Sequence, residues 1–480
     1  MKTAELVFIP FTAVGHLVSA IEIAKLLVSR NERLSVTVLV MKLPFDTSAH
    51  PKPFSDDTIA ERIRFVDLLL DDFTKDLLAK NPASFFKDFV DLQKPQVRQI
   101  VSEIMANGSG SAFNQLAGFV IDMFCTPMMD VADEFGVPTY VFFTSSASLL
   151  SLIFHLYTLQ EDLRKDMTEF KDSDAELSVP SFSNAVPAKV LPSGVLDKKI
   201  GSNMFINIAA RFKKVKAILV NTFDELESHA LKSLQNDGSI PPVYPVGPIL
   251  NLHNNKSEGV LMSWLDNQPP ASVVFLCFGS MGCFDGDQVK EIAHALERTG
   301  HRFLWSLRRR PNKSKIEMPV EYDNPQEVLP EGFTERTAEL GRVIGWAPQV
   351  AVLSHPAVGG FVSHYGWNLT LESLWFGVPV ATWPMYAEQQ MNAFQMVRVF
   401  GLAVEIKLDY RNDFRMTTTE IVTAEVIENG IRRLMEGDKS VEIRRRVKEM
   451  SEKSKITMAE GGSSHSCLGC FIQDVVNNVS

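Results

Sequence analysis

The sequence predicts an α/β protein built from two doubly wound, Rossmann-like domains that face a cleft. Short β-branched runs alternate with amphipathic helical stretches along most of the 480 residues, which is typical of parallel sheets covered by helices on both faces. The alternation occurs in two sets. A stretch rich in Pro, Gly and Asn, PPVYPVGPILNLHNNKSEG (241–259), separates them and is expected to be an exposed linker.

The first set of elements begins near the amino terminus. The apolar run Leu6–Ile9 predicts a buried strand, and apolar residues that recur every three to four positions after His16 predict a helix. Further strands are predicted at 35–41, 119–121 and 139–143. Residues 165–199 are expected to form a surface insertion.

The second set follows the linker. Strands are predicted at 273–278, 303–307, 342–345, 360–363 and 380–383, and a helix is predicted at 287–298. Residues 308–331 are expected to form another surface insertion. We expect its basic run, RRRPNKSKIEMP, to be a solvated loop with no role in binding nucleic acid.

Composition limits the classes of function. With 48 Lys and Arg against 58 Asp and Glu, the net charge of -10 favours neither nucleic acid nor anionic lipid. No apolar run approaches the roughly 20 residues of a membrane span, and Glu5 and Pro10 interrupt the apolar start in a way that argues against a signal peptide. The five cysteines are expected to be free thiols. We expect a cytoplasmic monomer without an integral membrane segment, a metal site or a bound cofactor.

Two polar residues lie where predicted strands of the first set end. Ligands of doubly wound sheets bind at the carboxyl ends of the strands, so His16 and Asp122 are expected to come close together there. A carboxylate on one imidazole nitrogen would let the other nitrogen take a proton from a substrate hydroxyl. The structural alternatives are a capping or packing role for His16 and a helix N-cap for Asp122. The turn PFTAVGH contains the single glycine Gly15 and so lacks the G-x-G-x-x-G pattern of a dinucleotide-binding turn. This argues against a nicotinamide-dependent oxidoreductase.

The densest signal is WAPQVAVLSHPAVGGFVSHYGWNLTLESLWFGVPVATWPMYAEQ, which ends at Gln389. SHYGWN joins a strand to a helix, so free backbone N–H groups beside His364 predict a site for a diphosphate. Glu372, one turn along that helix, is placed to accept hydrogen bonds from a ribose. Trp346 offers a flat face to a base, and Glu388 and Gln389 offer polar groups to sugar hydroxyls.

Each of these residues also has a structural alternative when it is taken singly. Trp346 and Trp367 are alternatively core aromatic residues, and Glu388 is alternatively a partner of its helix dipole. No single residue decides between the two interpretations.

Taken together, the stretch closely resembles the signature box of the plant UDP-dependent glycosyltransferases, which glycosylate small secondary metabolites. Similarity continues in FIPFTAVGH, VIDMFCTP, FFTSSA, VNTFDELE, YPVGPI, WLDNQPPASVVFLCFGSMG and EGGSS, so it spans essentially the whole chain. The resemblance implies a GT-B fold. It implies an acceptor-binding domain at 1–245, a linker at 246–258, a UDP-sugar-binding domain at 259–457, and a last helix at about 458–480 that packs back on the first domain.

The resemblance also implies inverting transfer of glucose from UDP-glucose, as co-substrate, to a hydroxyl of a small hydrophobic phenolic or terpenoid acceptor. His16 is then the general base, Asp122 is its partner, and Gln389 favours glucose. The implied donor-binding residues are Thr144, Ser280, Trp346, Gln349, His364, Trp367, Asn368, Leu369, Glu372, Glu388 and Gln389. Aromatic residues of the first domain are expected to line the acceptor pocket, with Phe11, Phe124 and Phe142 as candidates.

Two positions depart from the family pattern. Tyr365 stands where a Cys is usual, and Leu369 stands where a Ser hydroxyl normally helps to bind the diphosphate. Loss of one hydrogen bond to a charged phosphate is expected to cost about 10- to 100-fold in donor affinity or rate. The alternative hypothesis is therefore a protein of the same fold that binds a nucleotide sugar or a metabolite without turning it over.

Overall fold

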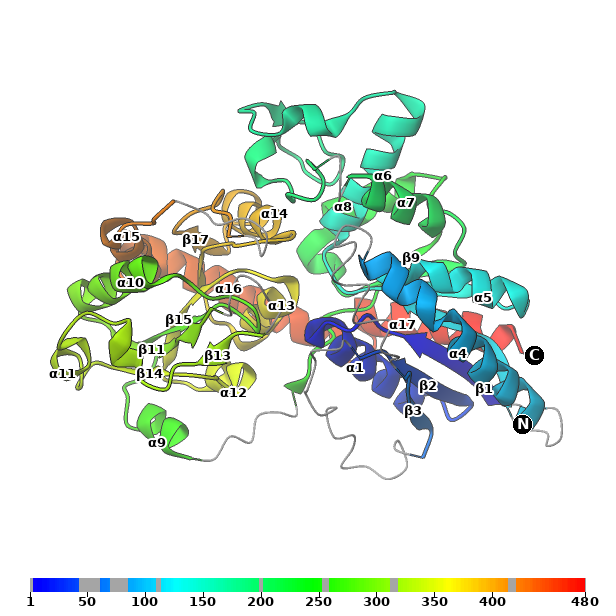
Figure 1. Ribbon diagram of the computed structural model, residues 1–480, viewed down its shortest axis with the longest axis horizontal. Helices are drawn as coiled ribbons and strands as arrows, with labels where there is room; N and C mark the ends of the chain where they lie inside the picture. Colours follow the sequence, from blue (N-terminus) through cyan, green and yellow to red (C-terminus); the bar gives the residue numbers. More distant parts are fainter. Residues whose placement is uncertain are drawn as a thin grey trace.

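The computed structural model describes residues 3–42, 61–69, 85–108, 114–197, 202–252, 259–310, 318–412 and 420–479. Its helices and strands form two lobes, each built around a parallel sheet (Figure 1). Parts of the predicted insertions (198–199 and 311–317) and of the predicted linker (253–258) lie outside the described residues.

The first sheet has seven parallel strands in the order β3-β2-β1-β4-β5-β8-β9. Its strands are β1 (Thr3–Ile9), β2 (Leu34–Val40), β3 (Ile63–Asp67), β4 (Asn114–Asp122), β5 (Thr139–Phe143), β8 (Ala217–Val220) and β9 (Val243–Pro245). The strand order reverses between β1 and β4, which places a topological switch point at their carboxyl ends.

The second sheet has six parallel strands in the order β14-β11-β10-β15-β16-β17. Its strands are β10 (Val273–Cys277), β11 (Arg302–Ser306), β14 (Gly341–Ile344), β15 (Val358–Ser363), β16 (Val380–Thr382) and β17 (Ala403–Glu405). Here the switch point lies between β10 and β15. The doubly wound prediction is confirmed for both halves.

Helices cover both faces of each sheet, because the central strands carry buried apolar residues on both sides. The first lobe has α1 (Val14–Arg30), α4 (Phe85–Gly108), α5 (Met129–Glu134), α6 (Ala147–Tyr157), α7 (Ser202–Phe212) and α8 (Asp224–Asn236). The second lobe has α9 (Val260–Asp266), α10 (Gly286–Thr299), α11 (Phe333–Arg336), α12 (Gln349–Ser354), α13 (Trp367–Phe376), α14 (Gln389–Phe394), α15 (Ala424–Met435) and α16 (Gly437–Met458).

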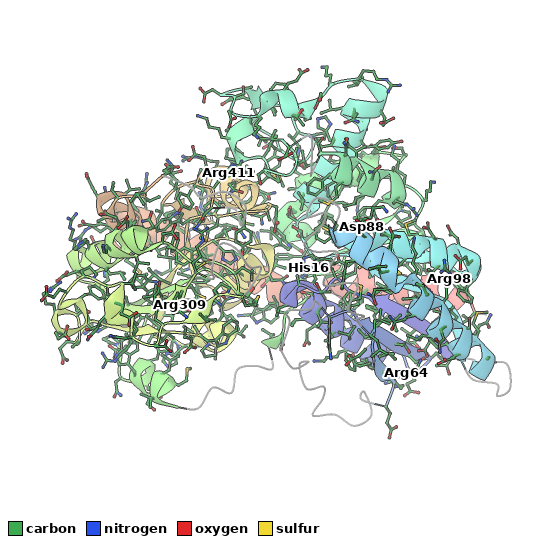
Figure 2. The ribbon with its side chains drawn as sticks, viewed as in Figure 1. His16, Arg64, Asp88, Arg98, Arg309 and Arg411 are labelled. Atoms are coloured by element: carbon green, nitrogen blue, oxygen red, sulfur yellow. The ribbon has the colours of Figure 1, made fainter. Side chains whose placement is uncertain are left out.

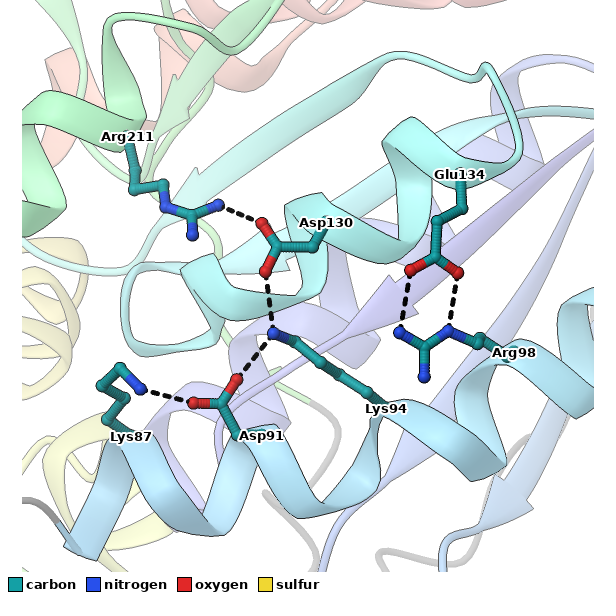
Figure 3. A network of polar contacts seen from close by, with 7 residues as sticks. All are labelled: Lys87, Asp91, Lys94, Arg98, Asp130, Glu134 and Arg211. Atoms are coloured by element: carbon teal, nitrogen blue, oxygen red, sulfur yellow. Dashed lines mark hydrogen bonds and ion pairs between the residues drawn. The ribbon is translucent and has the colours of Figure 1, made fainter.

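An ion-pair network joins α4 to α5 and α7 on the first lobe (Figure 3). Asp130 accepts hydrogen bonds from both Lys94, at 2.8 Å, and Arg211, at 2.5 Å, while Arg98 forms a two-pronged pair with Glu134. These side chains are partly exposed and screened by solvent, so the pairs contribute little to the packing.

The carboxyl-terminal helix α17 (Ser463–Asn477) packs against the first lobe, where Figure 1 shows the red end of the chain. Asp474 accepts a hydrogen bond from the Tyr244 hydroxyl at 2.6 Å, and the Asn478 amide donates to the Tyr140 hydroxyl at 2.7 Å. Phe471 contacts the edge of the Tyr140 ring. The apolar residues of α17 are therefore part of the hydrophobic core on one face of the first sheet.

The stretch predicted as an exposed linker differs from that prediction in its first part. Residues 243–245 form the edge strand β9, and Val246 and Ile249 are buried. An edge strand tolerates proline because one side of it needs no ladder hydrogen bonds. The Asn221 side chain also holds this segment, since its Oδ1 accepts from the backbone N–H of Ile249 at 2.7 Å.

Candidate active site

His16 and Asp122 meet at the switch point of the first sheet. His16 lies in the first turn of α1, directly after β1, and Asp122 ends β4, so their Nδ1 and Oδ2 atoms are 2.6 Å apart. The other oxygen of Asp122 accepts a hydrogen bond from Phe124 N at 3.0 Å and caps the 3-10 helix Met123–Met128. Asp122 thus combines the capping role with the pairing to His16. Figure 2 shows His16 between the two lobes.

Three effects act on the imidazole of His16. Burial lowers its pKa, but the Asp122 carboxylate, by charge and by hydrogen bond, and the Glu388 carboxylate across the lobe interface raise it. The net result is a pKa above the ordinary value of His. Among the described residues Nε2 of His16 has no hydrogen-bond partner, so this nitrogen is available to a substrate proton.

Other predicted residues surround the imidazole. Thr144 Oγ1 lies 3.1 Å from its Nδ1, and the rings of Phe11 and Phe124 lie 6.1 and 5.8 Å from the imidazole centroid. Phe142 is not part of this group. It is 2% exposed and packs on the other face of the sheet, in the cluster that contains Phe8.

The second lobe contributes the start of α13. Among the predicted diphosphate residues, Asn368 donates from its amide to Gly15 O at 2.9 Å, which brings the start of α13 to the start of α1. The carboxyl ends of β1 and β15 therefore face each other across the lobe interface. His364, at the end of β15, is 8% exposed, and burial together with the Arg308 guanidinium lowers its pKa to about 3.

Two of the three predicted nucleoside residues are in contact. Gln349 Nε2 donates to Glu372 Oε2 at 2.6 Å. Burial raises the pKa of Glu372 to about 7, although the hydrogen bond from Gln349 opposes the shift. Trp346 is 61% exposed, which leaves a face of its indole open to a base.

Glu388 and Gln389 stand at the start of α14, as the sequence predicted. Gln389 Oε1 accepts hydrogen bonds from the backbone N–H groups of Met385 and Tyr386, at 2.9 and 3.0 Å. Burial raises the pKa of the Glu388 carboxyl, and the charge of His16 opposes that shift. His16 and Glu388 thus interact electrostatically across the lobe interface.

Three residues of the stretch 346–389 are buried, namely Trp367, Leu369 and Tyr365. The Trp367 indole is 3% exposed and donates to Asn221 O at 2.7 Å, in line with the core-aromatic alternative. Leu369, 4% exposed, lies in one apolar cluster with Trp367 and Tyr365. Tyr365 is fully buried with φ +63°, a conformation that costs a non-glycine residue about 1 to 3 kcal/mol.

Arg308 was not among the predicted site residues. It was expected in a solvated loop, but it is 6% exposed, and its guanidinium donates to the carbonyl oxygens of Gly279 and Ser280. The cause is the short pairing of β12 (Arg308–Arg309) with β13 (Val320–Glu321), which turns Arg308 inward and leaves Arg309 exposed. Alternation along a strand was the one signal that would have separated these neighbours.

Two kinds of feature are absent from the described residues. These residues contain no group of three or more His, Cys, Asp or Glu side chains that could hold a metal ion. No helix in the same ranges is both long and apolar enough to cross a membrane. The cysteines in these ranges are free thiols, as predicted.

Comparison with known proteins gives one consistent answer. Residues 242–436 match the family model described as "UDP-glucoronosyl and UDP-glucosyl transferase". The chain is 53% identical to the UDP-glucose flavonoid 3-O-glucosyltransferase 6 of Fragaria ananassa, with 99% of each chain covered, and 54% identical to the UDP-glycosyltransferase 71E1 of Stevia rebaudiana, again with 99% of each covered.

The solved structures that this chain resembles are also glycosyltransferases. A transferase of Siraitia grosvenorii in complex with UDP is 48% identical, with a TM-score of 0.88 over 99% of this chain and 100% of that one. A Medicago truncatula glycosyltransferase complexed with UDP-glucose is 38% identical, with a TM-score of 0.83 over 98% of both chains. Both likenesses extend over the two lobes.

Proposed function

The chain belongs to the UDP-dependent glycosyltransferases of plants and has their GT-B fold, and from this premise we propose a reaction. The protein transfers glucose from UDP-glucose to a hydroxyl of a small phenolic or terpenoid acceptor, with inversion at the anomeric carbon. The relatives named for UDP-glucose and flavonoids support this donor and this class of acceptor. The domains are proposed to be 1–245 for the acceptor and 259–457 for the donor.

The contact between His16 and Asp122 is the observation that carries the proposal. The acceptor hydroxyl gives its proton to Nε2 of His16 while its oxygen forms a bond to the anomeric carbon and the bond from that carbon to the diphosphate breaks. The electron pair of the broken bond leaves with UDP. Since a phenol titrates near 10 and an imidazole near 6.5, proton transfer is coupled to bond formation and does not precede it.

Asp122 then stabilises the imidazolium that forms, because its carboxylate lies 2.6 Å from Nδ1. On the donor side we propose that Trp346, Gln349 and Glu372 bind the nucleoside and that Glu388 and Gln389 hold the sugar. The backbone N–H groups at the start of α13 are proposed to bind the diphosphate together with Ser280, His364 and Asn368. Since these groups can offset the leaving-group charge, we expect turnover to persist in EDTA.

The test is incubation of the protein with UDP-glucose and a panel of phenols and terpenoid alcohols. We expect stoichiometric release of UDP and glucoside, and a β-configured glucoside by NMR. An α-linked product would contradict inversion. Binding of UDP-glucose without turnover of any acceptor would support the alternative of a non-catalytic binding protein, which the missing hydroxyl at Leu369 raises.

A further inference from the structure

The proposed donor site must accommodate a diphosphate, whose negative charge grows as UDP leaves. A positive charge near the departing oxygen lowers the barrier most when it is fixed in place before the reaction. The sequence resemblance assigns the diphosphate to Ser280, His364, Asn368 and the start of α13. None of these side chains carries a fixed positive charge.

His364 is neutral at physiological pH. Its imidazole is buried, and burial together with the nearby Arg308 guanidinium lowers its pKa to about 3. The ring lies directly against Gly279. A side chain at that position would clash with it, since its Cβ would lie 2.6 Å from His364 Cε1. His364 can therefore offer a hydrogen bond to a phosphate but not a charge.

Arg308 brings a permanent charge to the same place. Its Nη1 donates to Ser280 O at 2.7 Å, its Nη2 donates to Gly279 O, and its guanidinium carbon lies 5.4 Å from the centroid of the Trp346 ring. One side chain thus holds the loop that carries Ser280 and supports one face of Trp346. Burial lowers the pKa of Arg308, but a guanidinium remains protonated at neutral pH.

Among the described residues no carboxylate forms an ion pair or hydrogen bond with Arg308, and the charge of Glu321 acts on its guanidinium only from a longer distance. Glu321, its register partner on β13, accepts a hydrogen bond from Trp346 N at 2.8 Å instead. The neighbouring Arg310, by contrast, pairs with Asp285 and Asn412. Burial of a cation without a direct ion pair is costly, so a site that retains one is suited to an anionic ligand.

We propose that Arg308 is a positioning residue of the donor site, which supplies its fixed positive charge to the diphosphate and holds Ser280 and Trp346 in place. This inference rests on the proposed function, since it takes UDP as the ligand. It adds a residue from outside the stretch 346–389, and it assigns the fixed positive charge of the donor site to Arg308.

The test is a series of affinities measured by calorimetry for uridine, UMP and UDP. The variants are R308Q, R308K and, as a matched control, R309Q, which removes the same charge from the exposed neighbour that Figure 2 labels on the second lobe. For R308Q we expect UDP affinity to fall by about 10- to 100-fold and uridine affinity by less than about fivefold, because uridine contacts only the Trp346 side. R309Q should behave like the wild type.

The ratio of UDP to uridine affinity decides the outcome. If R308Q lowers both affinities equally, or neither, Arg308 serves only the fold of the loop and the inference is wrong. If thermal unfolding shows that R308Q does not fold, R308K is measured instead, because it keeps the positive charge. A ratio of UDP to uridine affinity within about fivefold of the wild-type ratio supports a role for the charge. A ratio as low as that expected for R308Q overturns it. A wild-type protein that binds no UDP would instead refute the proposed function.

Discussion

Gln395 Nε2 lies 2.6 Å from Ser148 Oγ, and this hydrogen bond crosses from the second lobe to the first. Gln395 directly follows α14, whose N-cap is Glu388 and whose first residue is Gln389. Ser148 lies in the first turn of α6, four residues after Thr144. The buried Glu227 accepts hydrogen bonds from Ser148 N and Ser148 Oγ and so fixes that turn. The proposed sugar-binding turn is thereby tied to the turn beside His16.

The first prediction concerns this tie. Gln395→Ala is expected to lower kcat by about 3- to 30-fold, because alignment of base and sugar depends on sub-ångström placement of the two lobes. The affinity for UDP should change by less than about twofold, because the proposed UDP residues all lie on the second lobe. Initial-rate kinetics and calorimetry measure the two quantities.

Two variants sharpen that experiment. In a double-mutant cycle, Ser148→Ala with Gln395→Ala should lose less than the sum of the single effects. Gln326→Ala changes an exposed glutamine of the same lobe and should have no effect. An equal loss of UDP affinity and kcat would mean that Gln395 supports only the second lobe.

The second prediction concerns the base. His16→Ala is expected to lower kcat by about two to four powers of ten while UDP binding stays nearly intact, because the imidazole acts on the acceptor proton and not on the nucleotide. His301→Ala is the control, since His301 pairs with Glu436 on the second lobe. Unchanged turnover of a phenol, or an equal loss of UDP binding, would contradict the assignment.

The third prediction is a shift in the pH profile. The base works in its neutral form, and Asp122 and Glu388 raise the pKa of His16, so the acid limb of kcat/KM should lie above the usual range of His. Asp122→Asn removes the closer carboxylate, so the limb should move to lower pH while the plateau falls about 100-fold or more through loss of the correct tautomer. Glu388→Gln should move the limb in the same direction by less. A limb unmoved in both variants would show that another group titrates.

The fourth prediction concerns the ribose site. Burial raises the pKa of Glu372 to about 7, and ribose hydroxyls donate best to the ionised carboxylate. Uridine affinity should therefore rise with pH up to about 7 and level off above it, and binding near pH 6.5 should release protons. Uridine avoids the titration of the phosphates themselves. Glu372→Gln should bind more weakly and without this pH dependence, whereas a flat profile for the wild type would contradict the shifted pKa.

Much of the fold followed from patterns that are local in sequence. The strands at 6–9 and 273–278 were predicted because their apolar runs are buried whatever the detailed packing. The edge strand β9 was missed because its prolines indicate a linker, and only its pairing with β8 makes it a strand. Domain roles and boundaries stay predictions.

The site divides in the same way. The pairing of His16 with Asp122 follows from the rule that strand ends meet at a switch point. Trp346 and Trp367 looked equivalent in sequence, yet one is 61% exposed and the other 3%, because the second packs against the other lobe. Arg308 was not separated from Arg309, because strand alternation could not be applied to a basic run that was expected to be a loop.

The last prediction concerns Leu369, the third residue of α13. The family resemblance assigns a serine hydroxyl at this position to the diphosphate, so Leu369→Ser should raise kcat/KM for UDP-glucose by up to about tenfold. The same change removes a buried leucine from the cluster with Tyr365, so it should cost about 2 to 4 kcal/mol of stability and lower Tm.

Leu371→Ser is the matched control, because Leu371 is equally buried in the same helix and cluster: it should lower Tm without raising kcat/KM. The fully buried Tyr365 separates two further outcomes. If its bulk has shifted the turn beside His364, only Leu369→Ser combined with Tyr365→Cys will gain activity. If neither variant exceeds the parent at a temperature where all are folded, the leucine does not weaken the donor site, and its place in the apolar cluster accounts for it.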